Sequence, residues 1–391
     1  MLYKIIKNNY FKIVSQYIYR NLENSRFFFK KGKNWYNATS KVKQIAVLWG
    51  FSKWKWNTIA RYLPEYRVLM ASNKGNWADK KKLLDRSKNL IFIVWGYQCP
   101  PEVIQYAKER GFSLFIMEDG FIRSAELGCK HTEAQSLILD SKGIYFDATK
   151  ASDLEYILNT YQFLQYPALL DISKKLITVM KALRVSKYNP NLGIANNFNI
   201  LPRLGPKKRY RILVVGQLES DASLTYGLAS DWTNLKLLQT AHEDYPEAEI
   251  IYRPHPDTLY LERIDSMGRG NTKNRFYTIV SEDLLLADLF KEVDHVYTIT
   301  SLSGFEALLH GLPVTVMGMP FYSGWGLTED RQQCSRRTRS LSIEELFCGA
   351  YLLYPRYIAN LESPILGCLE TMIKVISPQI EDLQSKIQNN I

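Results

Sequence analysis

The feature that most constrains the fold is a regular alternation of short apolar runs with polar segments of helical length. Four apolar runs follow one another between residues 44 and 120, namely IAVLWG, RVLMAS, LIFIVWG and SLFIMEDG. Their β-branched and aromatic residues are typical of buried strands, and the segments between them, such as Pro101–Arg110, are typical of helices. This order of elements predicts βα units on a parallel sheet.

The same alternation begins again at RILVVGQ, after residues 151–185, which predict helices, and after a linker rich in Asn, Pro and Gly. Here we expect helices at about 231–243 and 282–290 between strands such as AEIIYRPHP and HVYTIT. At 391 residues the chain also exceeds what one hydrophobic core usually organises. We therefore predict an α/β protein of two Rossmann-like domains facing a central cleft, the GT-B arrangement, with ligands beyond the carboxyl ends of strands.

The predicted boundaries divide the chain into four parts. These are a basic N-terminal segment (1–43), a first Rossmann-like domain (44–200), a second Rossmann-like domain (207–340) and helices that close the fold (341–391). In the first part, Lys and Arg interleave with apolar residues at helical spacing, which predicts an amphipathic helix that could lie on an anionic membrane face. A helix docked on the first domain is an equally good interpretation. Within the first domain, LILDSKGIYFDAT predicts a strand, a turn and a second strand.

An excess of basic residues favours anionic partners. Lys and Arg number 50 against 39 Asp and Glu, a net charge of +11, which suits acidic membranes and phosphorylated or carboxylated substrates. No nucleic-acid-binding signature accompanies this charge, so we expect no nucleic acid partner. The five cysteines lack metal or disulfide spacing, and we find neither a secretory signal nor an apolar run of roughly 18 to 20 residues. These features predict a cytoplasmic location, with the inner membrane face as a further site if residues 1–43 bind it.

Polar side chains follow four of the predicted strands. The first group is Glu118, Asp119 and Arg123 in SLFIMEDGFIRS, where paired acids at a strand end could supply a general acid or base. A turn followed by a helix cap explains Asp-Gly equally well. The second group is Gln217, Asp221 and Ser223, where a carboxylate could attack an anomeric carbon or could simply cap a helix.

The third group lies in IIYRPHPD, where Arg253 and His255 alternate with prolines at a strand end. A cation and an imidazole on a rigid backbone suit a phosphate, so His255 is our choice among the five histidines. His295, by contrast, is expected at the surface before a strand.

The fourth group precedes and enters the helix in TSLSGFEALLHG. Thr300, Ser301, Ser303 and the free N–H groups near Gly304 could bind phosphate at a helix N-terminus. Glu306 is expected in the first turn, where it could accept ribose hydroxyls or complement the helix dipole. The stretch 318–328, dense in Gly, Pro, Tyr and Trp, predicts an ordered lid or wall. No Walker A loop, GxGxxG or HExxH motif occurs, which argues against an NTPase, a dehydrogenase and a zinc protease.

Together these motifs resemble the capsule polysaccharide biosynthesis family. The resemblance covers roughly residues 45–340 and is most specific in GFEALLHGLPV and PFYSGWGLT. Characterised members are retaining β-Kdo glycosyltransferases that use CMP-Kdo, and the EDG, HP and hydroxyl motifs also resemble those of bacterial GT-B sialyltransferases. Enzymes of this kind that build a poly-Kdo linker often carry two such modules in tandem, whereas one module is found here.

The resemblance implies a role for each group. Asp221 would form a covalent Kdo adduct and give net retention, Glu118 would act as acid or base, and Asp119 would orient it. The residues that bind the donor would be His255, Thr300, Ser301, Ser303, Gly304, Glu306, Arg253, Gln217, Ser223 and Arg123. The first domain would serve the acceptor, a glycan or a lipid-linked glycan, and the second the CMP-sugar. No metal or other cofactor is implied, because CMP is itself a good leaving group.

Two other interpretations stay open at this point. The same fold could use another donor, such as CMP-sialic acid or a UDP-sugar. The chain could also be a non-catalytic protein of capsule assembly that binds glycan or membrane, although a scaffold would not require Glu118, Asp221 and His255 together.

Overall fold

A computed structural model describes residues 44–71, 76–126, 131–189, 204–255, 276–280 and 285–389, with side chains as far as residue 379. The predicted N-terminal helix within 1–43 and the linker residues 190–203 lie outside the described residues. The chain divides into two compact units. Unit 1 consists of Met1–Glu118 and Gln162–Lys175, and unit 2 of Asp119–Tyr161 and Leu176–Ile391. The domain boundaries drawn from the sequence stay predictions.

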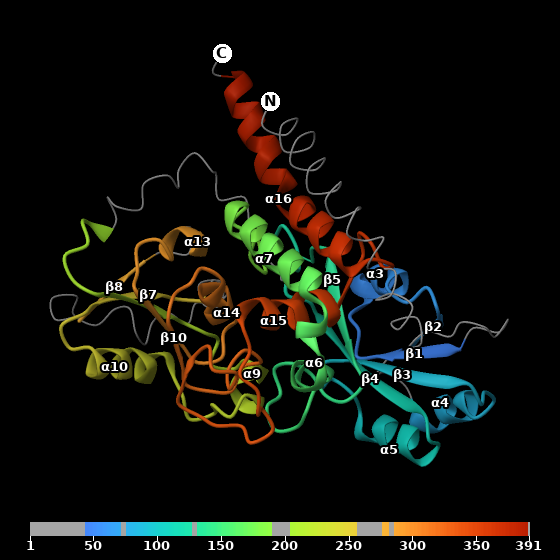
Figure 1. Cartoon of the computed structure of the whole chain (residues 1–391). Coiled ribbons are helices and arrows are strands. Elements are labelled where there is room, and N and C mark those ends of the chain that lie inside the picture. The colour runs from blue at the N-terminus through green and yellow to red at the C-terminus, as the bar shows by residue number, and fades with distance from the viewer. Residues whose placement is uncertain are drawn as a thin grey trace. The chain divides into compact units, whose positions relative to one another are not determined.

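Unit 1 is built on parallel strands joined by helices. Its strands are β1 (Ile45–Trp49), β2 (Arg67–Ala71), β3 (Leu90–Trp95) and β4 (Ser113–Asp119), in the order β4-β3-β1-β2. Parallel neighbours need crossover connections, which α3 (Trp56–Arg61), α4 (Trp77–Leu84) and α5 (Pro101–Glu109) supply. In Figure 1, α4 and α5 lie on one side of these strands and α3 on the other. All six residues of β3 are buried, as its continuous apolar run predicts.

Unit 2 contains a second sheet, in which every pair of neighbouring strands is parallel. Its order is β11-β10-β9-β6-β7-β8, with strands β6 (Arg211–Val215), β7 (Glu249–Arg253), β8 (Tyr277–Ile279), β9 (His295–Thr298), β10 (Val314–Val316) and β11 (Glu329–Asp330). Its helices are α9 (Ala222–Tyr226), α10 (Asn234–Asp244), α13 (Leu286–Leu289) and α14 (Leu302–Leu309). Numbered along the chain, the order is 3-2-1-4-5-6, the doubly wound order of dinucleotide-binding folds. The predicted α/β class with two largely parallel sheets is confirmed.

The rest of unit 2 is mostly helical, with one strand pair that the sequence does not fully predict. The elements are β5 (Ser136–Asp140), α6 (Asp153–Thr160), α15 (Ile343–Phe347), a π-helical turn (Cys348–Leu353), β12 (Pro355–Tyr357) and α16 (Pro364–Asn389). Helix α7 (Pro167–Ala182) belongs partly to each unit. The antiparallel pairing of β12 with β5 is missing from the prediction, since three residues that include a proline carry almost no strand signal. In the described part of the chain, no helix is long and apolar enough to span a bilayer.

Two expectations from the sequence are wrong, one about a strand and one about the exposure of a histidine. No strand forms at 144–148, because the chain turns there and Tyr145 packs edge-on against Phe121 at 4.8 Å between ring centroids. His295 is the first residue of β9 and only 1% exposed, so it is not a surface residue. Its Nε2 lies 2.9 Å from Thr315 Oγ1, a contact between neighbouring strands that the sequence does not reveal.

Stacked aromatic rings fill the core of unit 2. Tyr351 stacks on Phe347 at 4.7 Å, on Phe121 at 5.4 Å and on Phe305 at 5.6 Å between centroids. Phe321 joins the same cluster at 4.7 Å from Phe121. These rings explain part of the high aromatic content through packing rather than through binding of sugars.

Candidate functional site

The strand order of unit 2 marks the place where a ligand is expected. The chain runs from β6 outward to β7 and β8, then returns past β6 to β9 and runs outward the other way. In doubly wound sheets, ligands bind at the carboxyl ends of the two strands between which this reversal occurs. Here the residues that follow those two ends are Gly216 to Ser223 after β6 and Ile299 to Ser303 after β9.

Three predicted site residues meet at this point through their side chains. The Gln217 amide nitrogen Nε2 donates to Ser223 Oγ at 2.7 Å and to Thr300 Oγ1 at 2.9 Å. Its oxygen Oε1 accepts from the Thr300 backbone N–H at 3.1 Å. The side chains of Gln217 and Thr300 are buried, and Ser223 is half-buried. We call Gln217, Ser223 and Thr300 the amide–hydroxyl cluster; it joins the loop after β6 to the loop after β9.

Asn234 fixes the backbone of this cluster and is missing from the prediction. Its Oδ1 accepts from the Gln217 N–H at 2.8 Å, and its Nδ2 donates to the Gln217 carbonyl at 2.9 Å. Asn234 is the first residue of α10 and directly follows the N-cap Thr233, so its sequence position suggests only a helix start. A buried asparagine can imitate a backbone partner, and here it holds Gln217, the second residue of the loop, in place.

Asp221 lies directly beside the cluster as the N-cap of α9. Its Oδ1 accepts from the Ser223 N–H at 2.8 Å, and the residue is exposed. The capping interpretation is therefore correct, and it fixes the direction of the carboxylate through one oxygen. A capping role leaves a nucleophilic role open, since the side chain is on the surface at the reversal point.

The N-terminus of α14 supplies the second half of the site. Ser301 is the N-cap, with its Oγ accepting from the Ser303 N–H at 3.3 Å, so the helix begins two residues earlier than its predicted start at Gly304. A side chain at Gly304 would place its Cβ 2.3 Å from the Tyr322 hydroxyl, which in turn donates to the Ser301 carbonyl. Only glycine permits this approach, and Tyr322 thereby fixes the helix start.

Glu306 points elsewhere. Because α14 begins at Leu302, this residue lies in the second turn, and the expected first-turn position is wrong. Its Oε1 accepts from Ser186 Oγ at 2.7 Å and from the Lys187 N–H at 3.2 Å. Burial raises the pKa of Glu306, while these hydrogen bonds and the charge of Arg253 act in the opposite direction. The structure thus directs this carboxylate to residues 186–187.

Arg253 and His255 lie at the end of β7, the strand next to β6. Arg253 ends β7, and its carbonyl accepts from the Gly216 N–H at 2.8 Å, which ties this strand end to the start of the loop after β6. His255 comes two residues later and is half-buried. Both residues therefore belong to the same sheet edge as the amide–hydroxyl cluster.

The acids at the end of β4 have separate partners. Glu118 is half-buried, and its Oε2 would lie 3.2 Å from a Cβ at Gly96, so a glycine after β3 leaves room for this carboxylate. Asp119 Oδ2 accepts from Arg123 Nε at 2.8 Å, and Arg123 also donates to Ser124 Oγ. The Arg123 side chain is 1% exposed, so the structure uses it inside unit 2.

The stretch predicted as a lid or wall is a wall. Met319, Tyr322 and Trp325 are fully buried, and the Met319 N–H donates to the Gly227 carbonyl at 2.7 Å, one residue after α9. Its turns therefore pack under the site and connect α9 with α14.

Comparisons with known proteins identify the family of the chain. Residues 91–362 match the model of a family described as capsule polysaccharide biosynthesis protein. The chain belongs to this family. The matched range contains every predicted site residue of unit 2.

Individual relatives strengthen this assignment. The lipopolysaccharide-processing protein LpsZ of Rhizobium meliloti is 40% identical over 326 residues, which are 83% of this chain and 72% of LpsZ. The capsule polysaccharide modification protein LipA of Neisseria meningitidis is 35% identical over 312 residues, 79% of this chain but 42% of LipA. The chain thus spans less than half the length of LipA.

Two solved structures of Thermosulfurimonas dismutans KpsC share the fold. The β-Kdo 2,4 transferase gives a TM-score of 0.66 at 32% identity and covers 81% of this chain and 93% of that one. The β-Kdo 2,7 transferase gives 0.62 at 30% identity, covering 86% and 100%. The predicted GT-B-like fold class and the predicted family are both confirmed.

Proposed function

We propose that the chain is a glycosyltransferase that transfers Kdo from CMP-Kdo to a glycan or glycolipid acceptor of the capsule or lipopolysaccharide type. The observation that carries the proposal is the amide–hydroxyl cluster at the reversal point of unit 2, beside Asp221 and the start of α14. The two KpsC structures with the same fold are β-Kdo transferases, which supports Kdo as the transferred sugar.

The first chemical step uses Asp221. Its carboxylate attacks the anomeric carbon of Kdo, a C–O bond to the enzyme forms, and the bond to the CMP phosphate breaks with its electron pair leaving on the phosphate. Hydroxyls and N–H groups at the start of α14, with Ser301 and Ser303, would hold that phosphate, and His255 and Arg253 would add donors at the neighbouring strand end. CMP needs no further activation in this scheme, so we propose that no metal or other cofactor takes part.

The second step uses Glu118. An acceptor hydroxyl attacks the adduct from the face that CMP left, its proton passes to Glu118, and Asp221 is released. Two displacements at one carbon give net retention and a β-linkage. Asp119 would orient Glu118, and Gln217, Ser223 and Thr300 would hold the loop that carries Asp221. For Glu306 and Arg123 the internal contacts favour support of the fold over contact with the donor.

The decisive experiment incubates the protein with freshly generated CMP-Kdo and a panel of Kdo-terminated and lipid-linked acceptors. Product linkage is then determined by NMR. We expect transfer by the wild type and a loss of about 10³-fold or more in Asp221→Asn, with unchanged thermal stability. The matched control is Asp231→Asn, an exposed acid ten positions further along, which should stay within about twofold.

Competing donors are separated by two further measurements. Calorimetric titration with CMP, UDP and GDP should rank CMP first, and a preference for UDP would exclude a CMP-sugar donor. Transfer from CMP-sialic acid but not from CMP-Kdo would keep the chemistry and change the sugar. Absence of any transfer, combined with binding of acceptor glycan, would indicate a non-catalytic role.

We also propose that residues 1–43 bring the enzyme to lipid-linked acceptor at the inner membrane face. Their basic and apolar residues at helical spacing support this proposal. Flotation with anionic liposomes should carry the full chain but not a chain that begins at residue 44. Equal flotation of both would contradict it.

A further inference from the structure

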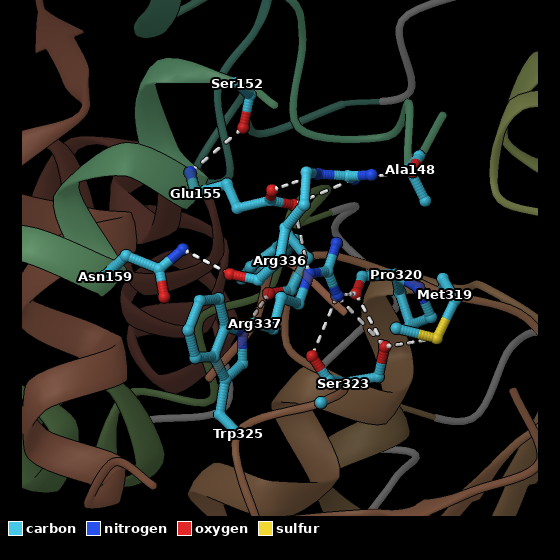
Figure 2. A network of polar contacts seen from close by, with 12 residues as sticks. Ala148, Ser152, Glu155, Asn159, Met319, Pro320, Ser323, Trp325, Arg336 and Arg337 are labelled. Carbon is cyan, nitrogen blue, oxygen red and sulfur yellow. Dashed lines mark hydrogen bonds and ion pairs between the residues drawn. The ribbon is translucent and has the colours of Figure 1, made fainter. Parts of the chain in front are cut away.

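Two consecutive arginines bind one buried carboxylate in unit 2, and none of these three residues takes part in the proposed reaction. Glu155, in the first turn of α6, accepts from Arg336 Nε at 2.6 Å through Oε1 and from Arg337 Nε at 3.2 Å through Oε2. The Glu155 side chain is 5% exposed and that of Arg337 is 3% exposed. Figure 2 shows the two guanidinium groups extending from this carboxylate in different directions. We call Glu155, Arg336 and Arg337 the arginine fork.

The Arg337 arm of the fork reaches the wall under α14. Its Nη1 donates to the carbonyls of Pro320 and Ser323, the latter at 2.8 Å, and to Ser323 Oγ at 3.2 Å (Figure 2). Between these two carbonyls lies Tyr322, whose hydroxyl donates to the carbonyl of the N-cap Ser301. Arg337 therefore fixes the turn that fixes the start of α14.

The Arg336 arm reaches α9. Arg336 Nη2 donates to the Ala148 carbonyl at 2.6 Å. The Ala148 N–H in turn donates to the Tyr226 carbonyl at 2.8 Å. Tyr226 is the last residue of α9, the five-residue helix that Asp221 caps. Arg336 is thus linked to the predicted nucleophile through one residue and one short helix.

The two arms converge on one site. The Met319 N–H donates to the Gly227 carbonyl, so the wall and the end of α9 touch directly. A guanidinium is planar and offers five donors in fixed directions, which lets one side chain bind a carboxylate and two carbonyls at once. A lysine keeps the charge but cannot reproduce this geometry.

We propose that the arginine fork is a positioning device that sets the distance between α9 with Asp221 and the N-terminus of α14 with Ser301. Glu155 anchors both arginines. Arg336 positions the nucleophile, and Arg337 positions the hydroxyls that bind the phosphate. The kinetic consequence rests on the proposed function; the mechanical linkage does not.

The kinetic test compares Arg336→Lys with Arg337→Lys, both of which keep the charge beside Glu155. Phosphate contacts act in the ground state and the transition state alike, so Arg337→Lys should raise the KM for CMP-Kdo about tenfold with kcat within about threefold. The nucleophile acts in the chemical step, so Arg336→Lys should lower kcat about tenfold with little change in KM. A merely structural role would not divide the two parameters between neighbouring residues.

Arg339→Lys is the matched control. Arg339 donates to the Leu158 and Tyr161 carbonyls at the end of α6, so it packs against the same helix. It should lose stability as the other variants do and keep both kinetic parameters within about twofold. Equal changes in all three variants, or no change in the fork variants, would overturn the proposal.

A second measurement works without turnover. In Arg337→Lys, the rate of amide hydrogen exchange should rise about tenfold or more in residues 320–324 and much less in residues 222–226. In Arg336→Lys, the larger rise should occur in residues 222–226. Exchange that rises equally in both segments, or in neither, overturns the linkage whatever the activity is. If the wild type transfers no Kdo while the exchange pattern divides as expected, the proposed function fails and the fork stands.

Discussion

Each unit has a reversal of strand order in its sheet, but different kinds of residues follow the carboxyl ends of the strands at that point. In unit 1 the reversal lies between β1 and β3, where Phe51 meets Trp95 edge-on at 5.4 Å and Lys55 Nζ lies 3.2 Å from the Trp95 ring centroid. In unit 2 the corresponding place holds the neutral amide–hydroxyl cluster of Gln217, Ser223 and Thr300. A reversal of strand order thus carries aromatic and cationic groups in one unit and hydrogen-bonding groups in the other.

This difference indicates that the strand order determines where a ligand binds, whereas the residues of the loops after the strands determine which ligand binds. Rings and a cation suit an anionic sugar, whereas hydroxyls and a helix start suit a phosphate. The following predictions test whether donor binding belongs to unit 2 alone.

Among these predictions, the largest effect is expected at Gln217. Replacement by Leu removes one hydrogen-bond partner from each of the Ser223 and Thr300 hydroxyls and the partner of the Thr300 N–H, so kcat/KM with CMP-Kdo should fall about 100-fold. The control is Gln98→Leu, an exposed glutamine beyond β3 at the reversal point of unit 1, which should stay within about twofold. Equal losses in both variants would break the comparison.

Gly304→Ala should have the next largest effect. The new Cβ would lie 2.3 Å from the Tyr322 hydroxyl, so the start of α14 must shift; we expect about tenfold weaker CMP binding and a loss of about 1–3 kcal/mol in unfolding free energy. Calorimetry and denaturant unfolding measure the two quantities. Adding Tyr322→Phe removes the hydroxyl and should restore part of the affinity; a further additive loss would contradict the contact.

Acid should weaken unit 2 more than unit 1. Burial lowers the pKa of His310 to about 4 and also lowers the pKa of His295, and unit 1 has no histidine. Below pH 6.5 these histidines are protonated in the unfolded state but stay neutral in the folded state. Their contribution to the free energy of unfolding is therefore fully present above pH 6.5 and decreases as the pH falls below it. Between pH 7 and 5.5 we expect His310 to lower the free energy of unfolding by less than about 1 kcal/mol, because solvent screens this partly exposed group. Unfolding of His310→Gln across this range should show a smaller slope, and an unchanged slope would contradict the assignment.

The smallest effect is expected in unit 1. Lys55→Met removes the cation above Trp95 and should lower the unfolding free energy by about 0.5–1 kcal/mol. Affinity for CMP, measured by calorimetry, should remain within about twofold of the wild type. A large loss of CMP affinity would place part of the donor site in unit 1.

Much of the fold follows from local sequence signals. The continuous apolar run of β3 and the helix at Pro101–Glu109 are predicted almost residue by residue, because burial on both faces and a proline at the helix start are local features. Strand β12 and the missing strand at 144–148 are not, since the first depends on pairing with β5, more than 200 residues away, and the second yields to aromatic packing.

The candidate site divides in the same way. Strand ends correctly bring Gln217, Ser223 and Thr300 together, because parallel strands place their carboxyl ends on one edge. The direction of Glu306 depends on a hydrogen bond from Ser186, 120 positions earlier in the chain, which no local sequence signal reveals. Asn234 and the arginine fork are invisible in the sequence, because their partners are fixed only by the folded chain.

The arginine fork has a consequence for the order in which the protein matures during synthesis. Every residue proposed to act on the donor has been translated by position 306, but Arg336 and Arg337 follow about thirty codons later, and they close on Glu155, which lies 181 and 182 positions earlier. Contacts of such long sequence separation form late. A nascent chain would therefore contain all residues that act on the donor before the contacts that position them could form. It would become able to catalyse transfer only after Arg337 had been added.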